Sequence, residues 1–382
     1  MATKKASKKA SKRTSTKASR KATQKTKLAR AKGKASAVKA IDGGKAAKTA
    51  KEATRRAASK AASSTKSGAS SKKRAGGSAT RHAARRRVET ISADIVRSRR
   101  LGKGVVWVIE AEVHVRAGAT LTVADGATIL IRNGLLKGSR LRRAALVFDP
   151  GSGLSAKRLS IRAANEANRP VRVADNGGVW FLGTFSGGSS DGITVKKVRG
   201  AKPSAFRATS LTVSHLGRGE RDLPRRGRRA GGERDDIDAL KLIGVGPEEW
   251  RIAAVRSLHS ADDGFDVTNS HVALDRLEVR SPTEDGLNIT SSRITIRRSL
   301  VVDAPRTKVA DRDLFDLETD DGAAYVELPR GCHVRLRGVF GDQLHLTSSD
   351  MPKPVTTADN ERRYAFSGKL KADALIHSLT ED

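Results

Sequence analysis

The feature that most constrains the fold is a repeat inside "HSADDGFDVTNSHVALDRLEVRSPTEDGLNITSSRITIRRS", residues 259–299. An acid-acid-glycine motif and the alternating residues after it recur 22 residues later as identical or similar residues. The matched pairs are Asp262/Glu284, Asp263/Asp285, Gly264/Gly286, Val267/Ile289, Thr268/Thr290, Ser270/Ser292, Val272/Ile294, Leu274/Ile296 and Arg276/Arg298. Self-similarity at a fixed period of this length is typical of stacked repeats, each of which buries its apolar face against its neighbours.

Short strands are predicted throughout the chain from residue 105 onward. Segments such as "VVWVIEAEVHV", "ATLTV" and "ATILI" alternate apolar and polar residues between glycines, and no amphipathic helix of three turns follows residue 104. Strands that begin with Asp recur at intervals of 27, 22, 28 and 29 residues, at Asp236, Asp263, Asp285, Asp313 and Asp342. We therefore expect an all-β solenoid rather than a sandwich or a barrel.

This pattern resembles the pectate-lyase-like superfamily, and "VHVRAGATLTVADGATILI" is similar to the first coils of many of its members. The resemblance covers roughly residues 105–350 and implies a single-stranded right-handed parallel β-helix. The predicted domains are a tail at 1–87, the β-helix at 88–350 and a C-terminal cap at 351–382. The segment 217–234 breaks the strand pattern with glycines and dense charge, so we expect a basic loop there.

The first 87 residues contain 29 Lys or Arg and two acids, a net charge of +27 that leaves +7 of the chain's +34 for the remainder. No aromatic residue precedes Trp107. Such a segment cannot bury enough apolar surface to offset the entropy of ordering, so we expect a long disordered basic tail. Dense like charge is typical of an arm that binds a polyanion, most often nucleic acid, although a purely solubilising tail is the alternative.

The tail resembles those of linker histones and of lysine-rich bacterial nucleoid proteins in its Ala-Lys-Lys and Ser-Lys-Lys repetition. The resemblance implies DNA as the partner and a cytoplasmic, nucleoid-associated location. Basic residues of the tail and of the 217–234 loop are the candidate nucleic-acid contacts: Lys4, Lys5, Lys8, Lys9, Lys12, Arg13, Lys72, Lys73, Arg74, Arg85, Arg86, Arg87, Arg225, Arg226, Arg228 and Arg229. No apolar run reaches the roughly 18 residues of a membrane span, so no membrane partner is expected.

The paired acids of the repeat suggest three interpretations. Asp-Gly builds turns, with Asp accepting backbone N–H bonds and Gly taking a positive φ. Alternatively, stacked carboxylates bind Ca²⁺, with Asp262, Asp263, Glu284 and Asp285 as ligands. A third possibility is catalysis by Asp236, Asp263 and Asp285, with Asp262 and Asp321 nearby, because glycoside hydrolysis requires paired acids on a rigid support.

The "ADDG" motif at 261–264 resembles the paired-Asp element of polygalacturonase-type hydrolases, while that family's other motifs are absent at matching positions. His259 is the one imidazole close to these acids in sequence. The leading hypothesis is a nucleic-acid-associated protein whose β-helix is a rigid binding or assembly module. The alternative is a polysaccharide lyase, a glycoside hydrolase or an anionic-glycan-binding protein, and the sequence does not decide whether the chain is an enzyme.

Overall fold

The structure is a computed structural model that describes residues 87–132, 136–137, 140–141, 144–171, 177–185, 202–219, 237–305, 312–341, 343–355 and 362–378. The chain divides into two units, Met1–Ala79 and Thr80–Asp382, and every described residue belongs to the second. Apart from Arg87, the predicted tail therefore lies outside the described residues, as do Asp236 and most of the predicted basic loop.

The described residues form strands and no helix, which confirms the all-β prediction for this part of the chain. None of them belongs to a helix of the length and apolarity that a membrane span requires.

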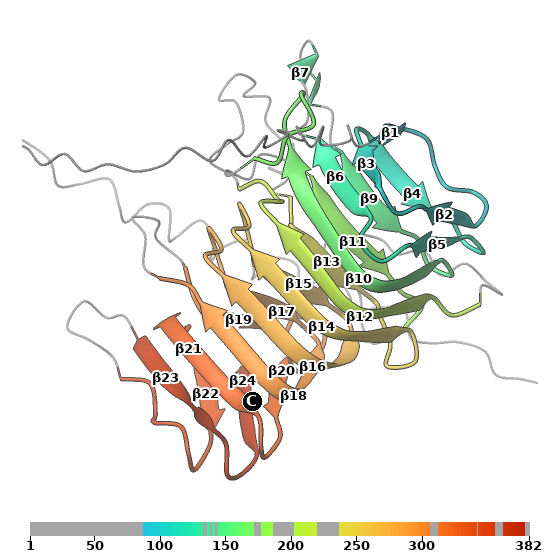
Figure 1. The fold of residues 1–382 in the computed structure, drawn as a ribbon. Helices are drawn as coiled ribbons and strands as arrows, with labels where there is room; N and C mark the ends of the chain where they lie inside the picture. The colour runs from blue at the N-terminus through green and yellow to red at the C-terminus, as the bar shows by residue number, and fades with distance from the viewer. Residues whose placement is uncertain are drawn as a thin grey trace, which may run out of the picture. The chain divides into compact units, whose positions relative to one another are not determined.

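Two sheets contain nearly all of the strands (Figure 1). The larger sheet consists of β1 (Arg87–Ile91), β2 (Arg99–Leu101), β3 (Val105–Ile109), β5 (Thr120–Val123), β6 (Thr128–Arg132), β10 (Gly153–Ala164), β12 (Ala205–Ser214), β14 (Trp250–Leu258), β16 (His271–Arg280), β18 (Arg293–Asp303), β20 (Tyr325–Leu328), β21 (His333–Val339), β22 (Leu344–Thr347), β23 (Arg363–Lys369) and β24 (Ala374–Ser378). The smaller sheet consists of β4 (Glu112–Val115), β9 (Ala145–Phe148), β11 (Gly178–Leu182), β13 (Leu240–Ile243), β15 (Phe265–Thr268), β17 (Leu287–Thr290) and β19 (Phe315–Glu318). A separate hairpin pairs β7 (Leu136–Lys137) with β8 (Arg140–Leu141).

From β10 to β19 the chain alternates between the two sheets, and each strand pairs in parallel with the strand two places later. Each repeat thus contributes a long strand to the larger sheet and a short strand to the smaller one. These parallel sheets are compatible with the predicted β-helix.

The 22-residue register is confirmed in the first part of the repeat, where Val267 pairs with Ile289 and Val272 with Ile294. The predicted pair Arg276/Arg298 is wrong, because the register shifts between Leu274 and Arg276 and Arg276 pairs with Ser299. One extra residue in β18 makes a β-bulge. The shift places Leu300 beside Leu277 in the core, where an unshifted register would have placed Ser299.

Apolar side chains from both sheets form one core between them. The rings of Phe148 and Phe181, from neighbouring strands of the smaller sheet, stack with centroids 4.8 Å apart and planes 2° apart. That separation matches the spacing of hydrogen-bonded strands, so like side chains stack directly on one another. Phe206 and Trp250 of the larger sheet meet the Phe181 ring edge-on.

The corners between strands repeat one backbone conformation. Asn269 and Ser291, which follow β15 and β17, both have φ of 48°. The N–H of each donates to the next repeat, Asn269 to the carbonyl of Thr290 and Ser291 to that of Glu318. A left-handed residue at each corner turns the chain from one sheet into the other while its N–H still bonds the neighbouring repeat.

The parallel order ends near the C-terminus of the described chain. β23 pairs antiparallel with β21, and β24 pairs antiparallel with both β20 and β22. A strand follows Asp342 as predicted, β22, although Asp342 itself lies outside the described residues. This strand belongs to the larger sheet and pairs antiparallel, so it does not continue the parallel repeats.

Candidate functional site

Four carboxylates occupy equivalent positions before successive strands of the smaller sheet: Asp238, Asp263, Asp285 and Asp313. Lys241 pairs with Asp266, and Asp238 and Asp263 each lie three residues earlier. The register of β15, β17 and β19 aligns Asp263, Asp285 and Asp313 in the same way. Asp238 therefore takes the place that the sequence interpretation gave to Asp236, and the interval between these repeats is 25 residues rather than 27.

The acids of this ladder bond to the next repeat. Asp263 Oδ1 accepts the backbone N–H of Asp285 at 2.9 Å, and Asp263 Oδ2 accepts Asn288 Nδ2 at 2.9 Å. Asp285 Oδ1 accepts the backbone N–H of Asp313 at 2.6 Å. The predicted bonding of Asp to backbone N–H groups is present, but it joins neighbouring repeats instead of closing a turn within one.

The glycines after these acids are needed for close packing rather than for a positive φ. Neither Gly264 nor Gly286 has a positive φ, so that part of the turn interpretation is wrong. A Cβ on Gly264 would collide with Val279 and approach the carbonyl oxygen of Gly286 to 2.5 Å. Only glycine lets adjacent repeats come this close.

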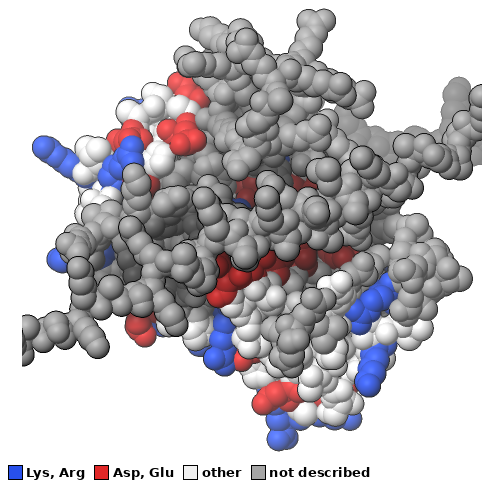
Figure 2. All heavy atoms as spheres, turned by 180° about the vertical axis from the view of Figure 1, so that it is seen from behind, with Lys and Arg blue, Asp and Glu red and all other residues white. Residues whose placement is uncertain are grey.

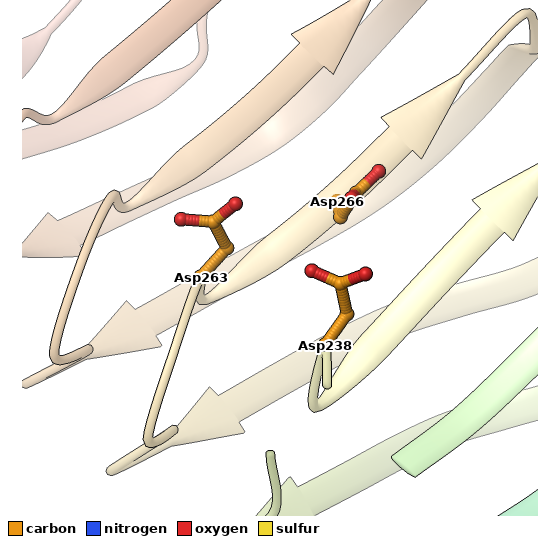
Figure 3. A group of neighbouring side chains, drawn as sticks. All are labelled: Asp238, Asp263 and Asp266. Carbon is orange, nitrogen blue, oxygen red and sulfur yellow. The ribbon is translucent and has the colours of Figure 1, made fainter. Parts of the chain in front are cut away.

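A lysine and a second acid complete the cluster beside Asp263. Lys241 Nζ donates to Asp238 Oδ2 at 2.8 Å and to Asp266 Oδ2 at 2.7 Å. Figure 3 shows Asp238, Asp263 and Asp266 on two adjacent repeats, with their carboxyl groups close together. Trp180, in register with Lys241, donates from Nε1 to the backbone carbonyl of Asp238 at 3.1 Å.

These acids are buried although they do not face the apolar core. Asp262, Asp263 and Asp266 are 1%, 6% and 5% exposed. Acidic side chains gather in a band on the face seen in Figure 2, which views the molecule from behind. When several carboxylates are buried close together, their pKa values rise unless opposite charges or hydrogen bonds stabilise each ionised group.

The pKa values of the cluster shift accordingly. Burial, followed by the charges of Asp285, Asp238 and Asp266, raises the pKa of Asp263 well above its usual range. Burial raises the pKa of Asp266 to about 7, helped by Asp238 and opposed by Lys241. Burial raises the pKa of Asp285 to about 8, although the N–H bond from Asp313 opposes the shift.

Lys241 stays charged at neutral pH. Burial alone would lower the pKa of its ammonium group, but the charges of Asp266 and Asp238 and their hydrogen bonds outweigh burial and raise it. The cluster thus combines the Lys241 ammonium group with two carboxyl groups, Asp266 and Asp285, whose pKa values lie near neutrality. Such groups can hold and transfer a proton.

Two sets of three acids bring oxygens within 4.8 Å of one another, Asp238/Asp263/Asp266 and Asp262/Asp263/Glu284. In the first set the Lys241 ammonium already bonds two of the three carboxylates. The second set contains three of the four predicted Ca²⁺ ligands, and Asp285 belongs to neither set. Of the two sets, Asp262/Asp263/Glu284 is the better candidate for a cation.

Ser270 and Ser292, which the repeat aligns, hydrogen-bond neighbouring repeats through their hydroxyl groups. Ser270 Oγ accepts the N–H of Val245 at 2.9 Å and donates to the carbonyl of Thr268 at 2.8 Å. Ser292 Oγ repeats this arrangement, accepting the N–H of Ser270 at 2.8 Å. Each hydroxyl thus joins its own strand end to the neighbouring repeat.

The other predicted residues make contacts of their own or lie outside the described part. The ring of His259 contacts that of His215, with centroids 4.9 Å apart and planes tilted by 31°. Asp321 is exposed in the turn after β19, where its N–H donates to Ser291 Oγ. Arg87 is exposed on β1 and pairs with Glu89 at 3.0 Å. The remaining predicted nucleic-acid contacts and Asp236 lie outside the described residues.

Sequence reasoning missed Asp238, Lys241 and Asp266. A usable signal was present: at an offset of 25, "DALKLI" aligns with "DGFDVT", so that Asp238 meets Asp263 and Leu242 meets Val267. Comparisons with known proteins add no further residue, because no family model, curated protein or solved structure matches this chain.

Proposed function

We propose that the protein associates with nucleic acid, and that residues 1–87 form a cationic arm that binds DNA without sequence preference. The observation that carries this proposal is the charge distribution, since the arm holds +27 of the chain's net charge of +34 with only two acids. An arm of this kind binds by neutralising phosphates and releasing their counterions, so its lysines and arginines act as a group.

In this proposal, the chain from residue 88 through β21 forms a single right-handed parallel β-helix that serves as a rigid body, and the antiparallel strands β22, β23 and β24 belong to its cap. The parallel pairing of alternate strands, the stacked Phe148 and Phe181 rings and the repeated left-handed corners support it. Right-handedness is what nearly all crossover connections between parallel strands adopt.

The test compares DNA binding by the full-length protein and by a fragment that begins at Val88, across a salt titration. If the arm contacts about ten phosphates, the log of the affinity falls with the log of the salt concentration at a slope near −9 for the full-length protein. We expect the fragment to lose retention on DNA at physiological salt. Retention unchanged by the truncation contradicts the proposal.

A second candidate function is acid-base cleavage of an anionic polysaccharide at the acid cluster. The observation that favours it is the pair of carboxyl groups with pKa values of about 7 and 8, Asp266 and Asp285, on adjacent repeats. Near neutral pH one such group can donate a proton while another accepts one. Half-buried Trp180, in register with Lys241, is an aromatic residue beside the cluster.

This candidate is tested by incubating the protein with a panel of uronic-acid polysaccharides and measuring reducing ends or unsaturated products. Activity in the wild type that disappears in Asp266→Asn and Asp285→Asn, with the fold intact, supports it. Equal product formation by the wild type and the two variants assigns the cluster to the structure alone.

A further inference from the structure

A basic groove runs across successive repeats of the larger sheet, whereas the acid cluster belongs to the smaller sheet. It encloses about 800 Å³ and spans strands β12, β14, β16, β18 and β21. The polar residues that line it include Ser210, Arg256, Arg276, Arg298, Ser299 and His333. Register places Ser210, Arg276, Ser299 and His333 in one row, because Ala254 pairs with both Ser210 and Arg276, and Ser299 pairs with both Arg276 and His333.

The bulge in β18 shapes this groove. Its extra residue leaves Arg297 and Arg298 both exposed and brings Ser299, rather than Arg298, opposite Arg276. From β18 the groove therefore receives both the Arg298 guanidinium and the Ser299 hydroxyl.

Two arginines that line the groove, Arg276 and Arg298, are available to a ligand. Arg276 is exposed and has no hydrogen-bond or ion-pair partner within the described part of the chain. Arg298, with its side chain 69% exposed, lies only at the margin of an ion pair, its Nε 3.7 Å from Asp275 Oδ2. Glu278 is the acid that lines the groove, and it is already occupied by Arg256 at 2.7 Å and by Arg280.

We propose that this groove binds the phosphate backbone of a nucleic-acid strand, as a second contact besides the arm. Arginine presents a planar fork of donors that matches phosphate oxygens, and the serine hydroxyls beside it supply further donors. This inference rests on the proposed association with nucleic acid, because the same chain carries an arm that would bring the strand to the groove. A polysaccharide carboxylate offers a similar charge, and the experiment separates the two.

The experiment uses the full-length protein and a DNA duplex in a salt titration. The double substitution Arg276→Gln and Arg298→Gln is compared with Arg97→Gln and Arg100→Gln, which removes the same charge from exposed residues at the other end of the larger sheet. Loss of about two phosphate contacts makes the salt slope shallower by about 2. The factor by which affinity falls between 50 and 200 mM salt is then roughly tenfold smaller for the groove variant than for the wild type.

Each outcome has one meaning. A shallower slope in the groove variant, with the control pair unchanged, supports the groove. Equal slopes in both double variants, with steep binding retained, overturn it and leave the arm intact. Absence of salt-dependent binding in the wild type overturns the proposed function itself.

A parallel titration measures the binding of polygalacturonate to the same variants. If the groove variant loses polygalacturonate binding and keeps the wild-type salt slope for DNA, the nucleic-acid assignment is overturned. Arg276→Lys and Arg298→Lys together keep the charge, so we expect this variant to keep the wild-type slope. Its failure to do so overturns the electrostatic reasoning.

Discussion

Asp285 makes the stability of the protein fall as pH rises. Its pKa is raised from the ordinary 3.8 to about 8, chiefly by burial. Between these values the folded protein holds a proton that the unfolded chain releases, so the stabilisation present below pH 4 is lost progressively up to pH 8. One such group changes the free energy of unfolding by about 1.4 kcal/mol per pH unit, or roughly 3 kcal/mol between pH 5 and pH 7.

The substitution Asp285→Asn isolates this contribution. The amide oxygen of Asn can still accept the N–H of Asp313, but it carries no ionisable proton. We expect the stability of the variant relative to the wild type to grow by about 3 kcal/mol from pH 5 to pH 7.

The assay is urea unfolding, followed by the fluorescence of Trp107, Trp180 and Trp250, the three tryptophans of the chain. Asp320→Asn, at an exposed acid of the turn after β19, is the matched control. If the difference between Asp285→Asn and the wild type is the same at pH 5 and pH 7, Asp285 is ionised in the folded protein and the reasoning fails.

Two further predictions concern stability. Buried Glu249 accepts the backbone N–H groups of Thr184, Ser204 and Gly246. Glu249→Ala leaves these three donors unpaired, so we expect the free energy of unfolding, measured in urea, to fall by about 3–6 kcal/mol. Glu248→Ala is the control, and because the side chain of Glu248 is 82% exposed, we expect it to be near neutral. Equal losses would show that the network contributes nothing. Gly264→Ala should lower the melting temperature strongly because its Cβ meets Val279 and the Gly286 carbonyl, whereas Gly322→Ala, with nothing within 4 Å, should not; similar melting temperatures would refute the packing argument.

The parts of the fold that the sequence predicts are those set by the apolar core. Val267/Ile289 and Val272/Ile294 face inward in neighbouring repeats, so like side chains recur at the offset that stacks them. The shift to an offset of 23 at Leu277/Leu300 was also readable, because only that offset keeps leucine on leucine after the bulge.

The acid cluster was only partly predictable because its side chains face away from the core. At the equivalent position of successive strands stand Lys241, Asp266, Asn288 and Asp316. No packing constraint makes such residues alike, so self-similarity does not detect them. Asp263 and Asp285 were detected because Gly264 and Gly286 beside them are fixed by the close approach of adjacent repeats.

Strand register in this protein is independent of the length of the connections between strands. From Arg280 to Asp285 the chain takes five residues, and from the equivalent Asp303 to Asp313 it takes ten, yet Leu287 and Phe315 still pair in parallel. The added length lies where the chain passes from the larger sheet to the smaller one. That passage is therefore a suitable place for inserting foreign peptides, because we expect residues added between Pro305 and Arg312 to leave the register of the strands unchanged.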